Sequence, residues 1–357
     1  MPFRGAIDCD IHVSVPSTRA LLPYLDDYWR DTIGTIVRGI EHLDLTSYPR
    51  NASLSCRADW QPQTGEKPAS SLEVVQRQLL EPFGMRFAVA NGLHGAQMLN
   101  NGDMGAVLCS ALNDWMAEHW LDREPRLRAS IVVSLQNPDT AVAEIERLAH
   151  DKRFVQVLVV SSGEMPLGRR YYWPVYAAAE KHSLPIGVHA GSMYRHATSQ
   201  SGFPSTLVED YITLSQGLGS QLASFLAEGV FVKYPALKLV LIESGVSWLP
   251  SLMWRFGKDW RGTRGEIPWL NQIPAEVIRE HVRLTLQPFD GPPAPADIER
   301  LFEHMGSDRL VLFSTDYPHH QFEGEAALPE GLPPHLAQKI LVDNPLETYS
   351  RLRESLI

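Results

Sequence analysis

Eight short apolar runs, separated by stretches of helical period, constrain the fold of this chain more than any other feature. The runs are continuously apolar instead of alternating with polar residues, which is typical of parallel strands buried on both faces. Between them, residues 139–150, 175–181 and 220–227 repeat their apolar side chains at helical spacing. Such units favour an α/β fold, a closed (β/α)8 TIM barrel, over an open doubly wound sheet, and no Gly-x-Gly-x-x-Gly follows the first run. The predicted strands are residues 6–11, 87–90, 128–133, 155–160, 186–189, 237–242, 282–286 and 310–313.

Three long segments interrupt this regular alternation, at residues 13–86, 191–219 and 255–280. Each follows a predicted strand, so it leaves from the C-terminal face of the barrel, where barrel active sites lie. Long connections in a compact domain are usually functional. We therefore predict a single domain over residues 1–357, with an insertion at about 13–86 and long inserted loops that form the walls of the site.

The net charge of −10, from 42 acidic and 32 basic residues, comes without any block of Lys or Arg. This balance argues against nucleic acid or an anionic membrane as a partner, and we expect a small-molecule substrate. The first residues lead into a strand without a signal-peptide pattern, and no apolar run approaches about 20 residues. The three cysteines, Cys9, Cys56 and Cys109, lie far apart, which favours a reducing cytoplasm over a disulfide framework. We expect a cytoplasmic homo-oligomer, a dimer or larger, in which exposed loop aromatics cover the site or form the subunit contact.

Two ionisable side chains, Asp10 and His12, end the first predicted strand. Residues two apart on a strand point to the same face, so both can enter the barrel mouth and reach one cation. Asp8 lies on that face one step deeper. The alternative is a polar cluster at a strand end, without a ligand.

Three further apolar runs end in groups that can bind a metal or transfer a proton, namely His189, Glu243 and Asp316. A buried apolar run that ends in a polar group is costly unless that group has a partner, so four such ends suggest a shared ligand, most economically a divalent metal. Histidine is the commonest metal ligand, although a lone buried histidine can instead be a hydrogen-bonded core residue. Asp316 can bind metal, accept a proton or form the turn before Tyr317-Pro318. Glu243 can be a ligand or a general acid/base.

The loops offer candidates for substrate binding. Arg195 can clamp a carboxylate with two parallel hydrogen bonds, or it can be a solvated loop arginine. His319 can contact the substrate or lie in an exposed loop. Aromatic side chains of the inserted loops, with Trp60 as the chosen candidate, can pack against a substrate ring.

Taken together, these motifs resemble the amidohydrolase superfamily, and in particular its aminocarboxymuconate-semialdehyde decarboxylase-like branch. The resemblance extends over essentially the whole chain and rests on the order and spacing of several short motifs. They are Tyr172-Trp173-Pro174-Val175-Tyr176, residues 185–191, residues 234–239, Trp248-Leu249-Pro250, residues 314–319 and residues 339–345.

The resemblance implies one metal site formed by Asp10, His12, His189 and Asp316. The family usually has His-x-His or Glu-x-His in the first strand, and here Asp10 occupies the first of those places. Relatives often have a histidine at the end of strand six, where this chain has Glu243-Ser244-Gly245. Two imidazoles and two carboxylates favour Zn, Mn or Fe(II) as the single divalent ion.

Three functions are consistent with these residues. The leading hypothesis is a metal-dependent hydrolase of a small cyclic or aromatic amide, lactone or carboxylate, in which the cation activates a water and Asp316 or Glu243 transfers the proton. The alternative is a metal-dependent, non-oxidative decarboxylase of an aromatic or unsaturated carboxylic acid. A third possibility is a non-catalytic barrel that binds a small ligand.

Overall fold

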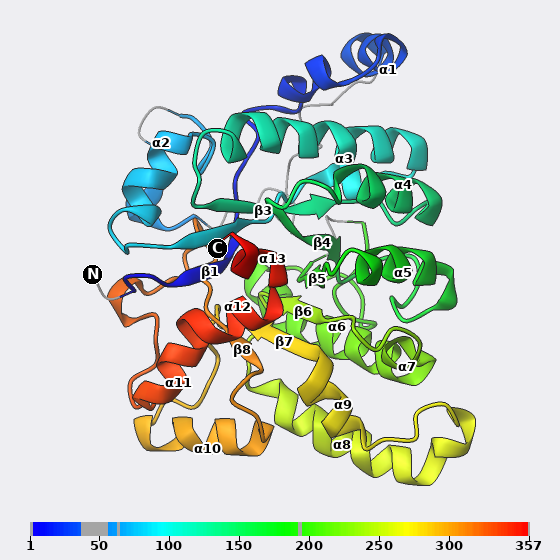
Figure 1. The fold of residues 1–357 in the computed structure, drawn as a ribbon, viewed down its shortest axis with the longest axis vertical. Helices are drawn as coiled ribbons and strands as arrows, with labels where there is room; N and C mark the ends of the chain where they lie inside the picture. The colour runs from blue at the N-terminus through cyan, green and yellow to red at the C-terminus, as the bar shows by residue number, and fades with distance from the viewer. Residues whose placement is uncertain (1–2, 37–55, 63–64, 192–194, 356–357) are drawn as a thin grey trace.

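Eight parallel strands form one sheet in strict chain order, from β1 to β8, with helices in the connections (Figure 1). The structure, a computed structural model, describes residues 3–36, 56–62, 65–191 and 195–355. The strands are β1 Ile7–Ile11, β2 Phe87–Ala90, β3 Leu127–Val132, β4 Phe154–Val160, β5 Ile186–His189, β6 Leu239–Ile242, β7 Val282–Thr285 and β8 Val311–Leu312. Every strand residue is buried, as expected for continuously apolar runs covered on both faces.

Backbone hydrogen bonds join β1 to the segment that follows β8 and so close the barrel. Cys9 donates to the carbonyl of Phe313 at 2.9 Å, and Asp316 donates to the carbonyl of Asp10 at 3.1 Å. The amide of His12 donates to Tyr317 at 2.7 Å. The predicted (β/α)8 TIM barrel is therefore confirmed, and each predicted strand overlaps an observed one.

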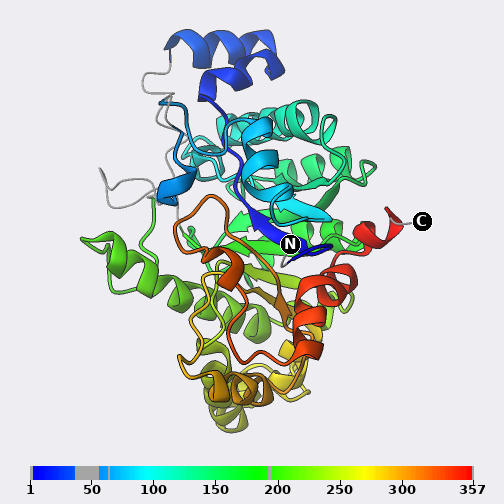
Figure 2. The ribbon, with the colours of Figure 1, turned by 90° about the vertical axis from the view of Figure 1, so that its left-hand side faces the viewer.

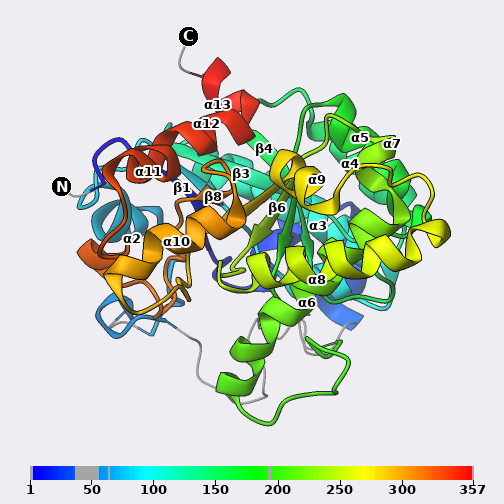
Figure 3. The same ribbon diagram turned by 90° about the horizontal axis from the view of Figure 1, so that it is seen from below.

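The helices pack around the barrel and in its connections (Figures 1 and 3). They are α1 Asp27–Asp31, α2 Leu72–Val75, α3 Gly102–Met116, α4 Pro138–Leu148, α5 Trp173–Lys181, α6 Leu207–Glu228, α7 Val230–Lys233, α8 Trp248–Thr263, α9 Pro274–His281, α10 Pro295–Met305, α11 Pro334–Gln338, α12 Asn344–Thr348 and α13 Ser350–Glu354. In the part of the chain that the structure describes, no helix has the length and apolar character needed to cross a bilayer.

Two of the three segments predicted as long loops contain helices that the prediction did not include. Within residues 191–219, α6 begins at Leu207 after a capping box in which Thr206 and Glu209 satisfy each other's backbone amides. Residues 255–280 belong mostly to α8 and α9, which pack against each other. The start of α6 projects away from the barrel (Figure 3).

The connection from β1 to β2 is the longest, and it leaves the barrel at the end of β1. Its described part contains η1 Thr18–Tyr24, α1, η2 Thr32–Ile36, η4 Ala58–Trp60, α2 and η5 Gln76–Leu80. The first of these elements packs on α3, and the dark-blue helices stand at one end of the molecule in Figure 2. Residues 37–55 of the predicted insertion lie outside the described part of the chain.

The C-terminal helices lie across the starts of the strands (Figure 1). Arg351 of α13 is only 2% exposed, and its guanidinium donates to four backbone carbonyls. Two of these bonds reach Phe154 at 2.6 Å and His182 at 3.0 Å. Arg351 therefore ties the end of the chain to the start of β4.

Replacing this arginine is expected to destabilise the fold. Arg351→Ala leaves buried carbonyls without donors, and hydrogen bonds to charged groups contribute about 1.5–3 kcal/mol each. We expect the free energy of unfolding, measured by chemical denaturation, to fall by about 3 kcal/mol. Arg353→Ala, an exposed arginine in the same helix, is the matched control and should change it by less than about 0.5 kcal/mol. Equal effects of the two variants would contradict the assigned role.

Candidate metal centre at the barrel mouth

Four side chains from three strand ends meet at the C-terminal mouth of the barrel. The Nε2 atom of His12 lies 3.0 Å from Oδ1 of Asp316 and 3.5 Å from Oδ1 of Asp10. The Nε2 atom of His189 lies 3.4 Å from Nε2 of His12 and 4.0 Å from Oδ2 of Asp10. The structure thus brings together the residues that the sequence analysis selected, although they are up to 306 positions apart in the chain.

The imidazoles of His12 and His189 approach each other through their Nε2 atoms, which are the nitrogens free to bind a ligand. Nδ1 of His12 donates to the carbonyl of Asn91 at 3.2 Å, and Nδ1 of His189 donates to the carbonyl of Ala190 at 2.7 Å. A carbonyl can only accept, so each neutral ring carries its hydrogen on Nδ1 and presents a lone pair at Nε2. Two lone pairs at 3.4 Å repel unless a proton or a cation lies between them.

The two aspartates each keep one oxygen without a partner. Asp10 accepts from Nδ2 of Asn91 at 2.8 Å through Oδ1, and Asp316 accepts from Nδ1 of His319 at 2.7 Å through Oδ1. Among the described residues, neither Oδ2 atom has a hydrogen-bond partner, and both carboxylates are fully buried. Buried unpaired carboxylate oxygens are costly, so they indicate a site made for a cation.

The two buried carboxylates also shift the pKa values of the histidines and carboxyls around them. Burial lowers the pKa of His12, but Asp10 and Asp316 outweigh it and raise the pKa to about 9. Burial and the neighbouring His12 ring lower the pKa of His189 to about 3. Burial acts to raise the pKa of Asp316, yet His319 and His12 hold it below its ordinary value. The site therefore holds a proton on His12 that a divalent cation would replace.

Glu243 lies at the edge of this cluster, directly after β6. Its Oε2 is 3.6 Å from Nε2 of His189, and its backbone amide donates to Oγ1 of Thr285 at 2.8 Å. Burial, together with Asp316 and Asp10, raises the pKa of Glu243 well above its usual value. Both Glu243 and Asp316 have a left-handed backbone, with φ of +57° and +56°. Such strain is uncommon and tends to occur at functional sites.

The donor set fits a divalent metal ion. The ligand atoms of Asp10, His12 and His189 all lie within 4.8 Å of one another, as do those of His12, Asp316 and His319. Both histidines are oriented by an Nδ1 bond to a carbonyl, which is the usual second-sphere arrangement of metal-binding histidines. Two imidazoles and two carboxylates suit a first-row divalent ion such as Zn, Mn or Fe.

The three predicted substrate-binding residues, His319, Trp60 and Arg195, lie in three different environments. His319 joins the cluster through Asp316, with its side chain 20% exposed. Trp60 is buried, its ring 4.8 Å from that of Tyr317 and 5.6 Å from that of Phe322. Arg195 donates to the carbonyl of Met98 at 2.7 Å and forms an ion pair with Glu164. Its guanidinium is already paired by these contacts.

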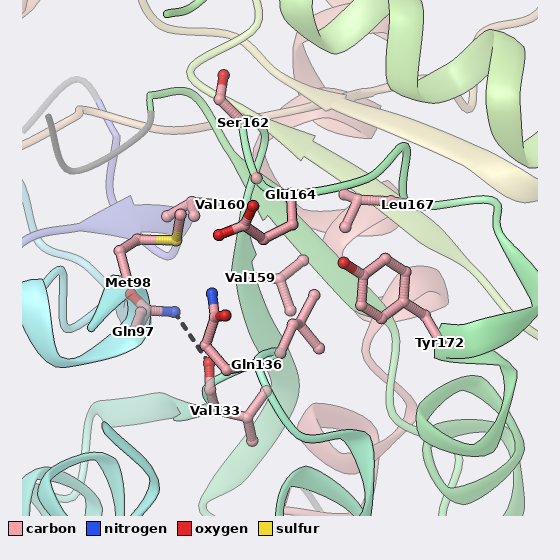
Figure 4. Close-up of a pocket in the computed structure, with 12 residues that line it drawn as sticks. Gln97, Met98, Val133, Gln136, Val159, Val160, Ser162, Glu164, Leu167 and Tyr172 are labelled. Atoms are coloured by element: carbon pink, nitrogen blue, oxygen red, sulfur yellow. Dashed lines mark hydrogen bonds between the residues drawn. The ribbon is translucent and has the colours of Figure 1, made fainter. Parts of the chain in front are cut away.

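Both partners of Arg195 line a pocket beside the ends of β3 and β4 (Figure 4). The pocket is open to solvent and has a volume of about 350 Å³. Apolar side chains such as Val133 and Val160 line it. Gln97 is held in its wall by donating to the carbonyl of Leu158 at 3.1 Å. The pocket offers additional space at the same face of the barrel.

Asn91 and Thr315 are site residues that the sequence analysis missed. Asn91 orients His12 through its carbonyl and Asp10 through its amide, and its own Oδ1 accepts from Ser130 and Gln156. Thr315 donates to Asp8 through its hydroxyl at 2.6 Å and its amide at 3.0 Å, which links β1 to the end of β8. The available signal was that Asn91 directly follows the apolar run of β2.

The fold and this cluster define a (β/α)8 barrel with a candidate divalent-metal centre at its C-terminal mouth. A family model described as amidohydrolase matches residues 7–351. The chain belongs to the amidohydrolase family, which confirms the resemblance seen in the sequence.

Curated relatives of the chain are decarboxylases. The gamma-resorcylate decarboxylase of Polaromonas sp. (strain JS666 / ATCC BAA-500) is 26% identical over 223 residues, which is 60% of this chain and 67% of the relative. The enzyme of the same name from Rhizobium sp. (strain MTP-10005) is 28% identical over 219 residues, 58% of this chain and 64% of the relative. The alignments thus span about two thirds of the relatives' length.

Solved structures share the fold over nearly the whole chain. The 5-carboxyvanillate decarboxylase of Sphingomonas paucimobilis superposes with a TM-score of 0.69 at 20% identity, covering 98% of this chain and 99% of its own. A dihydroxybenzoic acid decarboxylase from Polaromonas sp. JS666, with bound manganese and the inhibitor 2-nitroresorcinol, gives a TM-score of 0.67 at 18% identity and covers 99% of both chains.

Proposed function

We propose that this protein is a divalent metal-dependent, non-oxidative decarboxylase of an aromatic carboxylic acid that carries a hydroxyl group beside the carboxylate. The observation that carries the proposal is the convergence of Asp10, His12, His189 and Asp316, with two buried carboxylate oxygens left unpaired. Family membership and the curated decarboxylases support the choice of reaction.

We assign Asp10, His12, His189 and Asp316 as the residues that hold the metal, with manganese as the first candidate because three solved structures of fold neighbours contain it. When bound, the ion would supply positive charge that anchors and polarises the substrate carboxylate and its neighbouring hydroxyl. The lowered pKa of Asp316 suits a ligand that stays ionised.

Glu243 is the proton donor in this proposal. Burial, with Asp316 and Asp10, raises its pKa well above the usual value and so favours the protonated form, and it lies beside His189 at the edge of the cluster. The proton is transferred to the ring carbon that bears the carboxylate, and the bond between that carbon and the carboxylate then breaks to release carbon dioxide. The carboxylate of Glu243 regains its proton from solvent, so no oxidant or reductant is consumed.

The hydrolytic hypothesis uses the same centre but receives less support. It assigns Glu243 or Asp316 to accept a proton from water, whereas burial favours the protonated form of Glu243. The curated relatives break a carbon–carbon bond, as their names state. For these two reasons we place decarboxylation first. The alternative of a non-catalytic barrel would leave the unpaired carboxylate oxygens unexplained.

Two further expectations stay proposals. Free cysteines at positions 9, 56 and 109 support a reducing, cytoplasmic location. Exposed apolar side chains near the start of α6, including Val208 at 64% and Ile212 at 67% exposed, support a homo-oligomer, a dimer or larger, in which they are covered.

The test is a product assay with purified protein, Mn²⁺ and a panel of hydroxybenzoic acids that includes 2,6-dihydroxybenzoate and 5-carboxyvanillate. We expect one equivalent of carbon dioxide per acid consumed and, in D2O, one deuterium on the ring carbon that lost its carboxylate. Ring opening with uptake of water, and no carbon dioxide, would instead establish hydrolysis. Protein that binds no ion and turns over none of the panel would support the non-catalytic alternative.

A further inference from the structure

We infer that His319 is a positioning residue that orients Asp316 for a divalent cation, and that the end of the β1–β2 insertion holds His319 in place. The inference rests on the metal centre of the proposed function and not on the reaction assigned to it. It gives a role to a histidine outside the four assigned ligands and to part of the long insertion.

His319 contacts Asp316 at two points. Its Nδ1 donates to Oδ1 of Asp316 at 2.7 Å, and its backbone amide donates to the carbonyl of Asp316 at 2.8 Å. The ring also packs against His12, with 4.8 Å between ring centroids and an interplanar angle of 37°. One side chain therefore contacts two of the four assigned ligands.

The bond to Oδ1 determines which oxygen of Asp316 remains free. With Oδ1 bound by His319, rotation of the carboxylate is restricted, so Oδ1 stays 3.0 Å from Nε2 of His12 and Oδ2 has no partner among the described residues. Only the Nδ1 hydrogen is needed, and the neutral ring supplies it. Ligating carboxylates are commonly held by such outer hydrogen bonds, whose loss typically weakens metal binding about 10- to 100-fold.

The end of the β1–β2 insertion contacts the backbone on both sides of His319. Cys56 pairs with His319 in an antiparallel bridge, and the amide of Arg57 donates to the carbonyl of Pro318 at 2.8 Å. The Arg57 guanidinium donates to the carbonyl of Phe322 at 3.3 Å. The backbone on both sides of His319 is thus fixed to one segment of the insertion, and this fixes the position from which the His319 side chain reaches Asp316.

Trp60 extends this support. Its ring packs between Tyr317 and Phe322, which flank the His319 turn on either side. The hydroxyl of Tyr317 donates to Gln78 at 2.6 Å, so the turn is also tied to η5. We therefore assign Trp60 to the support of this turn.

The test measures the dissociation constant of Mn²⁺ on metal-stripped, full-length protein, by titration calorimetry or by the electron paramagnetic resonance signal of free Mn²⁺. We expect His319→Ala to weaken binding by about 10- to 100-fold. His319→Asn, whose amide nitrogen can replace the Nδ1 donor, should restore binding to within about threefold of the wild type. His320→Ala, the neighbouring exposed histidine, is the matched control and should bind as the wild type does.

Each outcome has a defined meaning. His319→Ala that binds Mn²⁺ within about twofold of wild type, while remaining folded by circular dichroism, would overturn the inference, as would an Asn variant as weak as the Ala variant. A wild type that binds Mn²⁺ with the expected order of variants but releases no carbon dioxide would overturn only the proposed reaction. A wild type that binds no Mn²⁺ would overturn both.

Discussion

Asp316→Asn is expected to lower the turnover number by about 10³-fold or more while leaving the fold intact. The substitution is nearly isosteric, and asparagine tolerates the left-handed backbone that Asp316 adopts, with φ of +56°. It removes the negative charge that holds His12 protonated or, in the loaded enzyme, would hold the cation. Loss of a first-sphere carboxylate should exceed the roughly 10- to 100-fold effect of losing an outer partner.

The measurement is kcat for carbon dioxide release, together with the metal content after gel filtration and the thermal unfolding midpoint. Asp139→Asn, an exposed aspartate in the first turn of α4, is the control and should behave as the wild type. Near-normal turnover by Asp316→Asn would remove this residue from the mechanism. A collapse of the unfolding midpoint would reassign Asp316 to the fold.

Glu243→Gln is expected to separate chemistry from metal binding. Glutamine keeps the shape of the side chain and faces the same backbone strain as glutamate, because both have an ordinary Cβ at φ of +57°. It lacks the acidic proton of the protonated form, which burial of Glu243 favours. We expect kcat to fall by about 10²- to 10⁴-fold, the range for loss of a general acid, with metal content unchanged.

The control is Glu276→Gln, an exposed glutamate in the first turn of α9. Loss of the metal in Glu243→Gln would show that Glu243 is a ligand, a role that the sequence left open. Turnover close to that of the wild type would exclude Glu243 as the proton donor and direct attention to Asp316.

The strands were predictable because each is a continuously apolar run, and burial on both faces requires that pattern. The predicted and observed limits of β2 and β5 are identical, and the other strands differ at their ends. Two helices in the long connections, α6 and α8, were harder to place from the sequence. The start of α6 was missed although Thr206 and Glu209 form a capping box there, and apolar side chains near its start, Val208 and Ile212, are exposed. The prediction also did not include α8, Trp248–Thr263.

The site residues also fall into two groups, those that the sequence predicted and those that it did not. Asp10, His12, His189 and Asp316 were found because each stands at the end of a strand, and the C-terminal ends of parallel barrel strands share one face. The partners that orient them could not be found from spacing alone. Asn91, for example, acts through both a side-chain amide and a backbone carbonyl, and only the tertiary structure places these two groups against different ligands.

By itself, the amino-acid sequence determined the barrel, the family resemblance and the polar strand ends, because burial of apolar strands and the direction of their side chains follow from local pattern. Tertiary structure alone decided what those ends contact. It paired Arg195 with Glu164, buried Trp60 against Tyr317 in the His319 turn and brought the Nε2 atoms of the two imidazoles to 3.4 Å from each other. Such contacts join residues tens to hundreds of positions apart, and their geometry depends on how the loops pack, which no local pattern encodes.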